Sequence, residues 1–103
     1  MDKGKIQKQI DTFLNRVKKF KPEKVFLCGS YAQKTANVYS DVDIVVISKK
    51  FKYMSAKMRF DQLYSLTTDL YPDFQVHGYT PIEIRKISKL TTLYYALQHG
   101  IVL

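Results

Sequence analysis

The sequence predicts one α/β domain over residues 1–103, in which a small mixed sheet is flanked by helices. Three observations lead to this fold class. Segments with helical spacing of apolar residues alternate along the chain with short runs rich in β-branched residues. The hydrophobic fraction of 46% is that of a globular protein and excludes disorder. A length of 103 residues supports one hydrophobic core and is too short for a second, substrate-holding domain.

The first quarter of the chain predicts a long helix followed by a buried strand. Apolar residues recur at helical spacing from Lys3 to about Phe20, with lysine and glutamine between them. Pro22 ends this helix. The strand covers Val25 to Cys28, Gly29 stops it, and a brief helix begins near Ser30.

The middle of the chain predicts a central strand, a second helix and a third strand. Asp41 to Ile47 is rich in β-branched residues and apolar on both faces beyond its acidic start. Ser55 caps the second helix, which Pro72 closes. The expected apolar stripe of this helix is Phe60, Leu63, Tyr64, Thr67, Leu70 and Tyr71. The third strand covers Phe74 to Tyr79.

The last quarter of the chain predicts a capped helix and a short edge strand. Thr80, Pro81 and Glu83 form a capping-box pattern, so Glu83 is interpreted as a helix cap and not as a catalytic acid. The helix runs to Gly100, which suits its C-terminal cap. The expected apolar stripe is Ile84, Ile87, Leu90, Leu93, Tyr94 and Leu97. Ile101 to Leu103 follows as the edge strand.

The chain carries a net charge of +8, and lysines crowd its first quarter. Such a surface attracts nucleotides, nucleic acid or an acidic protein; the alternative is a solvated helix face.

The N-terminus lacks the apolar segment of a signal peptide, and no stretch approaches the roughly 20 apolar residues of a membrane helix. We therefore expect a cytoplasmic protein without a membrane partner. The single cysteine, Cys28, excludes an internal disulfide and is expected in the core.

Gly29 and Ser30 form a candidate anion site. A strand that ends at Gly29 and a helix that begins at Ser30 direct free backbone N–H groups and a hydroxyl toward one point. Glycine also lets a phosphate approach the backbone closely. The alternative is an ordinary turn, in which Gly-Ser pairs are common.

Asp41 and Asp43 form a candidate metal site. Residues two apart on a strand point to the same face, which brings the two carboxylates close together. Their repulsion would raise at least one pKa, and a Mg²⁺ ion removes the conflict while also accepting phosphate oxygens. The alternatives are a turn residue for Asp41 and an outward-facing charge at a sheet edge for Asp43. On the first interpretation, phosphates bind the Gly29–Ser30 turn and the metal binds the aspartates.

The pattern Gly29-Ser30, ten residues, Asp41-x-Asp43 resembles the signature of the nucleotidyltransferase superfamily with the DNA polymerase β type of palm. It is most similar to the stand-alone minimal nucleotidyltransferases of bacteria and archaea. The stretches FQVHGYTPIEIRK and ALQHGIVL resemble the third strand, the following helix and the end of that family, so the resemblance covers nearly the whole chain. It implies a polymerase β palm-like fold, a triphosphate on Gly29 and Ser30, and Mg²⁺ held by Asp41 and Asp43.

The family completes its metal site with a third acid on the later strand. Alignment on Tyr79 puts Gln75 at that position, and an amide oxygen is a poor base and a weak Mg²⁺ ligand. Asp73, two residues earlier on the same strand face, is the candidate catalytic acid; its alternative is a turn residue after Pro72. His77 shares this face and is interpreted as a structural histidine, with contact to a nucleotide or partner as the alternative.

The resemblance implies an enzyme that transfers AMP from ATP to a tyrosine hydroxyl of a HEPN-domain toxin, acting as the antitoxin of a toxin–antitoxin pair. A rival hypothesis is an antitoxin with weakened catalysis that keeps a nucleotide pocket and neutralises its partner by docking. Gln75 favours the rival, whereas Gly29, Ser30, Asp41 and Asp43 favour the enzyme. A third hypothesis, RNA or DNA binding, rests on the lysines alone.

Overall fold

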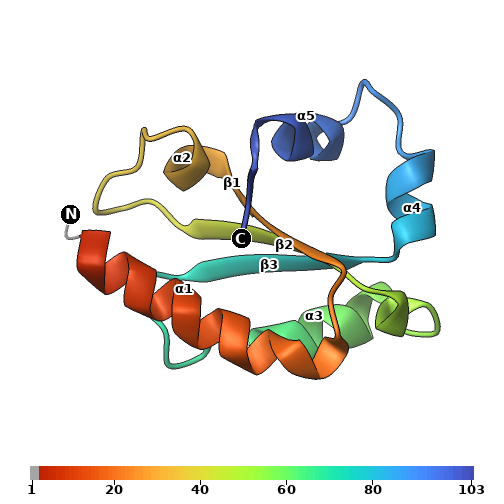
Figure 1. Cartoon of the computed structure of the whole chain (residues 1–103), viewed down its shortest axis with the longest axis horizontal. Helices are drawn as coiled ribbons and strands as arrows, with labels where there is room; N and C mark the ends of the chain where they lie inside the picture. Colours follow the sequence, from red (N-terminus) through yellow and green to blue (C-terminus); the bar gives the residue numbers. More distant parts are fainter. Residues whose placement is uncertain (1–2) are drawn as a thin grey trace.

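The computed structural model describes residues 3–103, and its elements are shown in Figure 1. They are α1 (Lys3–Val17), η1 (Lys18–Phe20), β1 (Lys24–Cys28), α2 (Gly29–Ala32), β2 (Val42–Ile47), η2 (Lys49–Phe51), α3 (Ala56–Tyr64), β3 (Phe74–Tyr79), α4 (Pro81–Lys86), α5 (Thr92–His99) and β4 (Ile101–Val102). Within this part of the chain, no helix is long and apolar enough to cross a membrane.

The four strands form one mixed sheet in the order β3-β2-β1-β4. β1 pairs antiparallel with both β2 and β4, while β2 pairs parallel with β3. Helices α1 and α3 cover one face of the sheet, and α2, α4 and α5 lie on the other side (Figure 1). This architecture confirms the predicted α/β class, in which a small mixed sheet is flanked by helices.

The core has two layers because β2 is apolar on both faces. Ile44 and Val46 are fully buried in the larger cluster, which α1 and α3 complete with side chains such as Phe13 and Leu63. On the other face, Cys28, Val45 and Ile47 form a smaller cluster beneath α5. A central strand buried on both sides accounts for the nearly continuous hydrophobic run in the sequence. Asp43 is the exception on the smaller face and is half-buried.

Local signals placed most boundaries correctly. The predicted helix at Lys3 to Phe20 is α1 with the 3₁₀ turn η1, and β3 covers the predicted residues Phe74–Tyr79. The Ser55 hydroxyl accepts a hydrogen bond from the Met58 N–H and caps α3. The predicted capping box is complete, because the Thr80 hydroxyl accepts from Glu83 N–H and the Glu83 carboxylate accepts from Thr80 N–H. Glu83 is therefore a cap, as expected.

The second helix is shorter than predicted and rotated about its axis. α3 ends at Tyr64, where the Ser65 hydroxyl donates to the Gln62 carbonyl at 2.7 Å and the Thr67 hydroxyl donates to the Tyr64 carbonyl at 3.0 Å. These hydroxyls compete with the backbone for helical carbonyls and favour turns. The predicted stripe residues Phe60, Tyr64 and Tyr71 are exposed, while the unpredicted Leu66 is buried beside Leu63 and Leu70.

The prediction of one continuous last helix was wrong. The chain forms α4 and α5 with a break between them, because Ile87 is extended and the Thr91 hydroxyl caps α5 by accepting from the Tyr94 N–H. Leu90, placed on the buried stripe, is 96% exposed in this break. Gly100 is the C-cap of α5, as predicted, but with an ordinary φ of −78°.

Candidate functional site

The Asp43 carboxylate lies directly against Gly29. Cys28, the last residue of β1, pairs with Asp43 across the antiparallel ladder, so the turn that follows β1 passes over this side chain. A Cβ on Gly29 would lie 2.3 Å from Asp43 Oδ2, and Gly29 has a φ of +66°. Both the close contact and the left-handed backbone favour glycine here. The structure thus brings the glycine turn and the acidic strand together, as the sequence pattern indicated.

Ser30 lies in the first turn of α2, which starts at Gly29. The turn is fixed by hydrogen bonds from Gln33 N–H to the Gly29 carbonyl at 3.1 Å and from Thr35 N–H to the Ser30 carbonyl at 2.9 Å. Cys28, at the N-cap position, supplies no side-chain cap. Because the first N–H groups of a helix have no acceptor within it, the backbone at Gly29 and Ser30 can donate to an anion beside Asp43.

Two carboxylates share this end of the sheet. Asp41 is exposed immediately before β2, and Asp43 is half-buried within it. Burial raises the pKa of Asp43, the negative charge of Asp41 raises it further, and the nearby His77 works in the opposite direction. A bound divalent cation would relieve both the repulsion and the cost of burial. The pair is therefore chemically suited to a Mg²⁺ ion.

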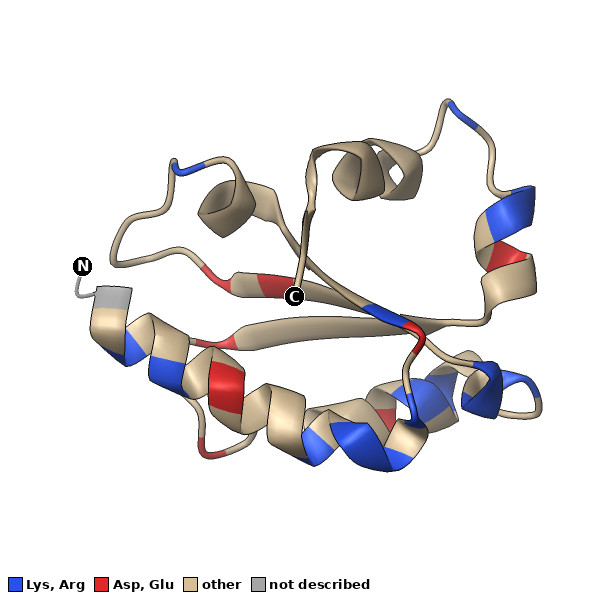
Figure 2. Cartoon of the chain, in the orientation of Figure 1, with Lys and Arg blue, Asp and Glu red and all other residues tan. Residues whose placement is uncertain are grey.

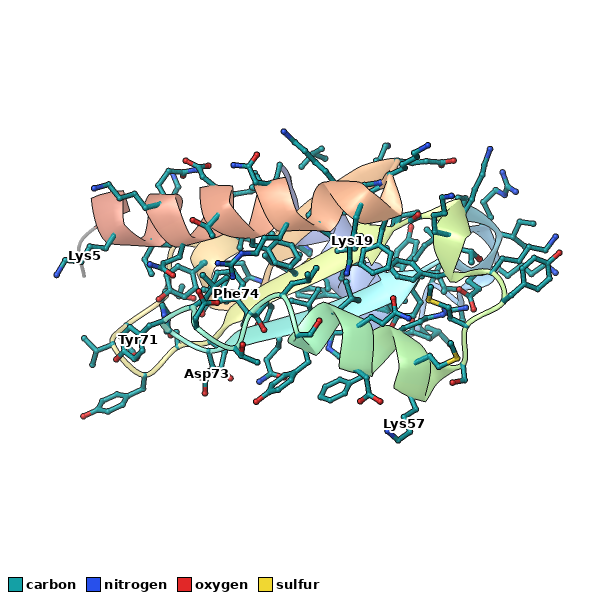
Figure 3. All side chains as sticks on the ribbon, turned by 90° about the horizontal axis from the view of Figure 1, so that it is seen from below. Lys5, Lys19, Lys57, Tyr71, Asp73 and Phe74 are labelled. Carbon is teal, nitrogen blue, oxygen red and sulfur yellow. The ribbon has the colours of Figure 1, made fainter. Side chains whose placement is uncertain are left out.

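Gln75 is the direct neighbour of Asp43 on the parallel strand β3. Asp73 lies just before β3, where its carbonyl accepts a hydrogen bond of 2.8 Å from the Val42 N–H, and its side chain is exposed. Figure 3 shows Asp73 near Tyr71, at the end of the molecule. Among residues 3–103, no three side chains of His, Cys, Asp or Glu are grouped so that they could hold a metal ion. Within the described residues, therefore, no third such side chain completes a metal-binding group with Asp41 and Asp43.

His77 is on the exposed side of β3, two residues beyond Gln75. Its charge acts on Asp43, so the two side chains are near each other. The sequence favoured a buried, structural role for His77. In the structure His77 is exposed and lies beside the candidate site. The useful signal was the two-residue spacing of Asp73, Gln75 and His77, which places all three on one strand face.

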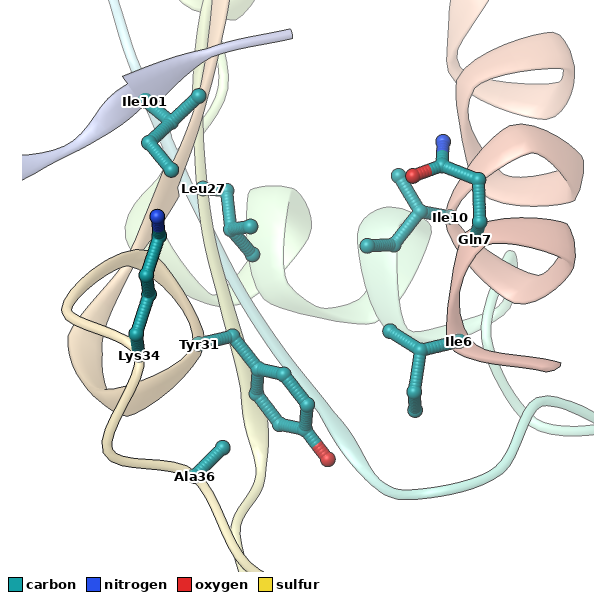
Figure 4. Close-up of a pocket in the computed structure, with 8 residues that line it drawn as sticks. All are labelled: Ile6, Gln7, Ile10, Leu27, Tyr31, Lys34, Ala36 and Ile101. Atoms are coloured by element: carbon teal, nitrogen blue, oxygen red, sulfur yellow. The ribbon is translucent and has the colours of Figure 1, made fainter. Parts of the chain in front are cut away.

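Tyr31, an aromatic residue that the sequence offered as a cover for the nucleotide or a partner contact, is a neighbour of the site. Burial raises the pKa of its hydroxyl, and the proximity of Tyr71 and Asp41 adds to this effect. The ring also lines an apolar pocket of about 560 Å³, with Ile6 and Ile10 of α1 on one side and Lys34 on the other (Figure 4). Tyr31 follows Ser30 directly in the sequence, and this position was the available signal.

Cys28 is buried beside the site, next to Gly29 in the chain. Burial raises the pKa of its thiol to about 11, and the Asp43 charge contributes in the same direction. The thiol is therefore protonated at neutral pH and packs as a small apolar side chain. This result confirms the expectation of a core cysteine.

The fold, and the contact between the glycine turn and Asp43, are typical of domains that transfer nucleotides. A family model described as a nucleotidyltransferase domain matches residues 10–98, and the chain belongs to this family. Nucleotidyltransferase domains are transferases that generally use nucleoside triphosphates and divalent metals. No curated protein matches the sequence.

The fold is also similar to a solved structure. The crystal structure of a "putative nucleotidyltransferase" from Sulfolobus solfataricus matches with a TM-score of 0.63 and 18% sequence identity. The match covers 99% of this chain and 87% of that chain. It supports a polymerase β-like fold, which the sequence resemblance had implied.

Proposed function

We propose that this protein is a Mg²⁺-dependent nucleotidyltransferase that transfers AMP from ATP to a tyrosine hydroxyl of a HEPN-domain toxin, and that it thereby acts as the antitoxin. The observation that carries the proposal is the contact between Gly29 and the Asp43 carboxylate. This contact supports the proposal because triphosphate chemistry needs phosphate-binding N–H groups close to a metal-binding carboxylate.

Each site residue has a defined role in this proposal. The N–H groups at Gly29 and the hydroxyl and N–H of Ser30 hold the triphosphate. Asp41 and Asp43 hold Mg²⁺, which when bound supplies positive charge to offset that of the phosphates. The acceptor oxygen forms a bond to the α-phosphorus while the bond from that phosphorus to the bridging oxygen breaks. Pyrophosphate leaves with the bridging oxygen, and the hydroxyl proton passes to water.

A protein acceptor is consistent with the architecture of the chain. The described residues form one sheet with its helices, and the start of β2 and the helix α2 lie at one end of that sheet (Figure 1). In this proposal the acceptor tyrosine is presented by its own protein, which contacts this domain directly. The choice of a HEPN-domain toxin and of tyrosine rests on the resemblance to minimal nucleotidyltransferases.

Label transfer tests the proposal. ATP labelled at the α-phosphate is incubated with Mg²⁺, this protein and a HEPN-domain protein encoded beside it. We expect label on the partner, with none for Asp43→Ala or when the metal is chelated. Asp61→Ala, which removes an exposed acid on α3, is the matched control and should retain transfer. Label that persists in Asp43→Ala would refute the assignment.

A second candidate function is neutralisation of the partner by docking, with weakened catalysis. The specific observation in its favour is Gln75, which pairs with Asp43 where the family carries an acid. Docking predicts a complex that forms without Mg²⁺ and without label, and that survives Asp43→Ala. The two functions are thus separated by the same set of variants.

A further inference from the structure

We propose that a lysine-rich surface at the other end of the sheet binds single-stranded nucleic acid. This surface, the basic end, consists of Lys18, Lys19, Lys21, Lys24, Lys49, Lys50, Lys52 and Tyr53. The proposal concerns a surface outside the nucleotide site and does not depend on the function proposed above.

Two separate segments build the basic end. Lys24, at the start of β1, pairs with Ile47 at the end of β2. The Ser48 hydroxyl donates to the Phe20 carbonyl, and the Phe20 and Phe51 rings lie 5.2 Å apart. These buried contacts fix residues 18–24 against residues 48–53, so their lysines share one surface. Figure 2 shows the concentration of basic residues there.

The positive charge of this surface is largely uncompensated. All seven lysines are exposed, and Glu23 is the one acid in the two segments. Glu23 lies 3.6 Å from Lys49 as an exposed ion pair, which contributes little. A row of flexible ammonium groups is suited to the phosphates of a polyanion in a sequence-independent way.

Tyr53 adds a stacking surface beside these charges. Its side chain is 89% exposed, and the Lys52 ammonium lies 5.3 Å from the ring centroid. An exposed aromatic ring next to cations is the arrangement by which proteins hold unpaired bases while contacting the backbone. This feature favours a single strand over a duplex.

The composition of the basic end favours nucleic acid over an acidic protein. Protein interfaces are depleted in lysine and are organised around apolar anchors. Here Phe20 and Phe51 are turned into the core, which leaves Tyr53 as the exposed large apolar side chain of the two segments. The six residues of β2 separate this surface from Asp41 by about 20 Å, so its ligand need not contact the nucleotide site.

Fluorescence anisotropy with a labelled oligouridylate of about 20 nucleotides tests the proposal on the full chain. With about four phosphate contacts, the dissociation constant should rise about 50-fold between roughly 50 and 200 mM salt. Replacing Lys49 and Lys50 by glutamate should weaken binding at least about tenfold and flatten this salt dependence. The matched control replaces the exposed Lys86 and Lys89 by glutamate and should weaken binding less than about threefold.

Tyr53 provides a second readout. Tyr53→Ala should weaken binding at least about fivefold with an unchanged salt dependence, whereas Tyr53→Phe should bind like the original chain. Tyr39→Ala, which removes a 91% exposed tyrosine elsewhere, should bind normally. Equal loss for the two lysine pairs, or no binding near 50 mM salt, would overturn the proposal. Equally effective competition by polyglutamate would assign the surface to an acidic protein instead.

Discussion

The carboxylate of Asp43 fills the space that a side chain on Gly29 would need, since a Cβ there would lie 2.3 Å from Asp43 Oδ2. The contact makes the glycine turn and the acidic strand one structural unit, in which a side chain at Gly29 would displace the Asp43 carboxylate.

Gly29→Ala should disable this unit. The new methyl group displaces the Asp43 carboxylate, and the φ of +66° adds strain of about 1–2 kcal/mol. We expect nucleotidyl transfer to fall at least about 100-fold, as a displaced catalytic group commonly causes. Gly78→Ala is the control, because its Cβ would meet the Phe51 ring at 2.9 Å and strain the fold on the opposite face of the sheet from Asp43. Full activity in Gly29→Ala would contradict the proposed site.

Gln75→Asp should strengthen metal binding. The substitution puts a third carboxylate beside Asp43, because Gln75 is in register with Asp43 on the neighbouring strand. We expect Mg²⁺-dependent transfer to rise about tenfold or more, because a charged oxygen is a better ligand than an amide oxygen. Gln75→Asn keeps the shortened side chain without the charge and should show no gain. Equal rates for the two variants would show that charge at this position is not limiting.

Asp43→Asn should stabilise the fold at neutral pH in the absence of metal. The raised pKa of Asp43, caused first by burial and then by Asp41, means that folding favours the protonated carboxyl. The resulting loss of unfolding free energy is absent below the ordinary aspartate pKa and grows as pH rises through the raised pKa. At higher pH this loss stays constant. Urea unfolding at several pH values should therefore show a gain for Asp43→Asn near pH 7 that disappears in acid.

Mg²⁺ provides the internal check on that experiment. The ion should stabilise the original chain and leave Asp43→Asn nearly unchanged, which narrows the difference between them. A variant that is less stable than the original chain at neutral pH without metal would contradict the raised pKa.

Arg59→Ala should be strongly destabilising. The Arg59 side chain is 13% exposed and donates to the Glu83 carboxylate at 2.7 Å and to the carbonyls of Phe51, Met54 and Gly78. Removing it takes away a charge-assisted hydrogen bond to Glu83 and three hydrogen bonds to backbone carbonyls, at a cost of about 3 kcal/mol in unfolding free energy. Arg59→Lys should recover part of this loss, and Arg85→Ala on the exposed side of α4 should cost less than about 0.5 kcal/mol.

The hydrogen bonds of Glu83 with Arg59 and Thr80 also make the stability of the fold depend on pH. Burial raises the pKa of Glu83, but hydrogen bonds from Arg59 and Thr80 outweigh it, and the net pKa is lowered. The associated stability is present above the ordinary glutamate pKa and is lost as pH falls through the lowered value. Urea titrations should show that Arg59→Ala removes most of this acid-dependent loss.

Features encoded by neighbouring residues were predictable from the sequence. The strand Phe74–Tyr79 is delimited by Pro72 and by the Thr80–Glu83 capping box, and both of its ends were placed correctly. The break near Leu90 was missed because apolar spacing continues across Ser88 and Thr91, whose hydroxyls nevertheless favour caps. Periodicity alone cannot weigh these local hydrogen bonds.

In the candidate site, too, some features were predictable from the sequence and others were not. The spacing from Gly29 to Asp43 indicated that the turn and the acids converge, and the structure brings them together. The alignment on Tyr79 put Gln75 at the expected third-acid position, and the structure adds that Gln75 is in register with Asp43. The partial burial of Asp43 and the proximity of Tyr31 to Asp41 depend on how α2 packs over the sheet. Such packing arises from contacts distant in sequence, which a single sequence does not specify.

The two ends of β2 carry opposite charges. The aspartates lie where β2 begins, and Lys24, Lys49 and Lys50 cluster where it ends. In the field of an anionic surface the chain should rotate so that its lysines approach first. Protein adsorbed on a sulfonate resin should accordingly present its aspartates to the solvent and still admit ATP.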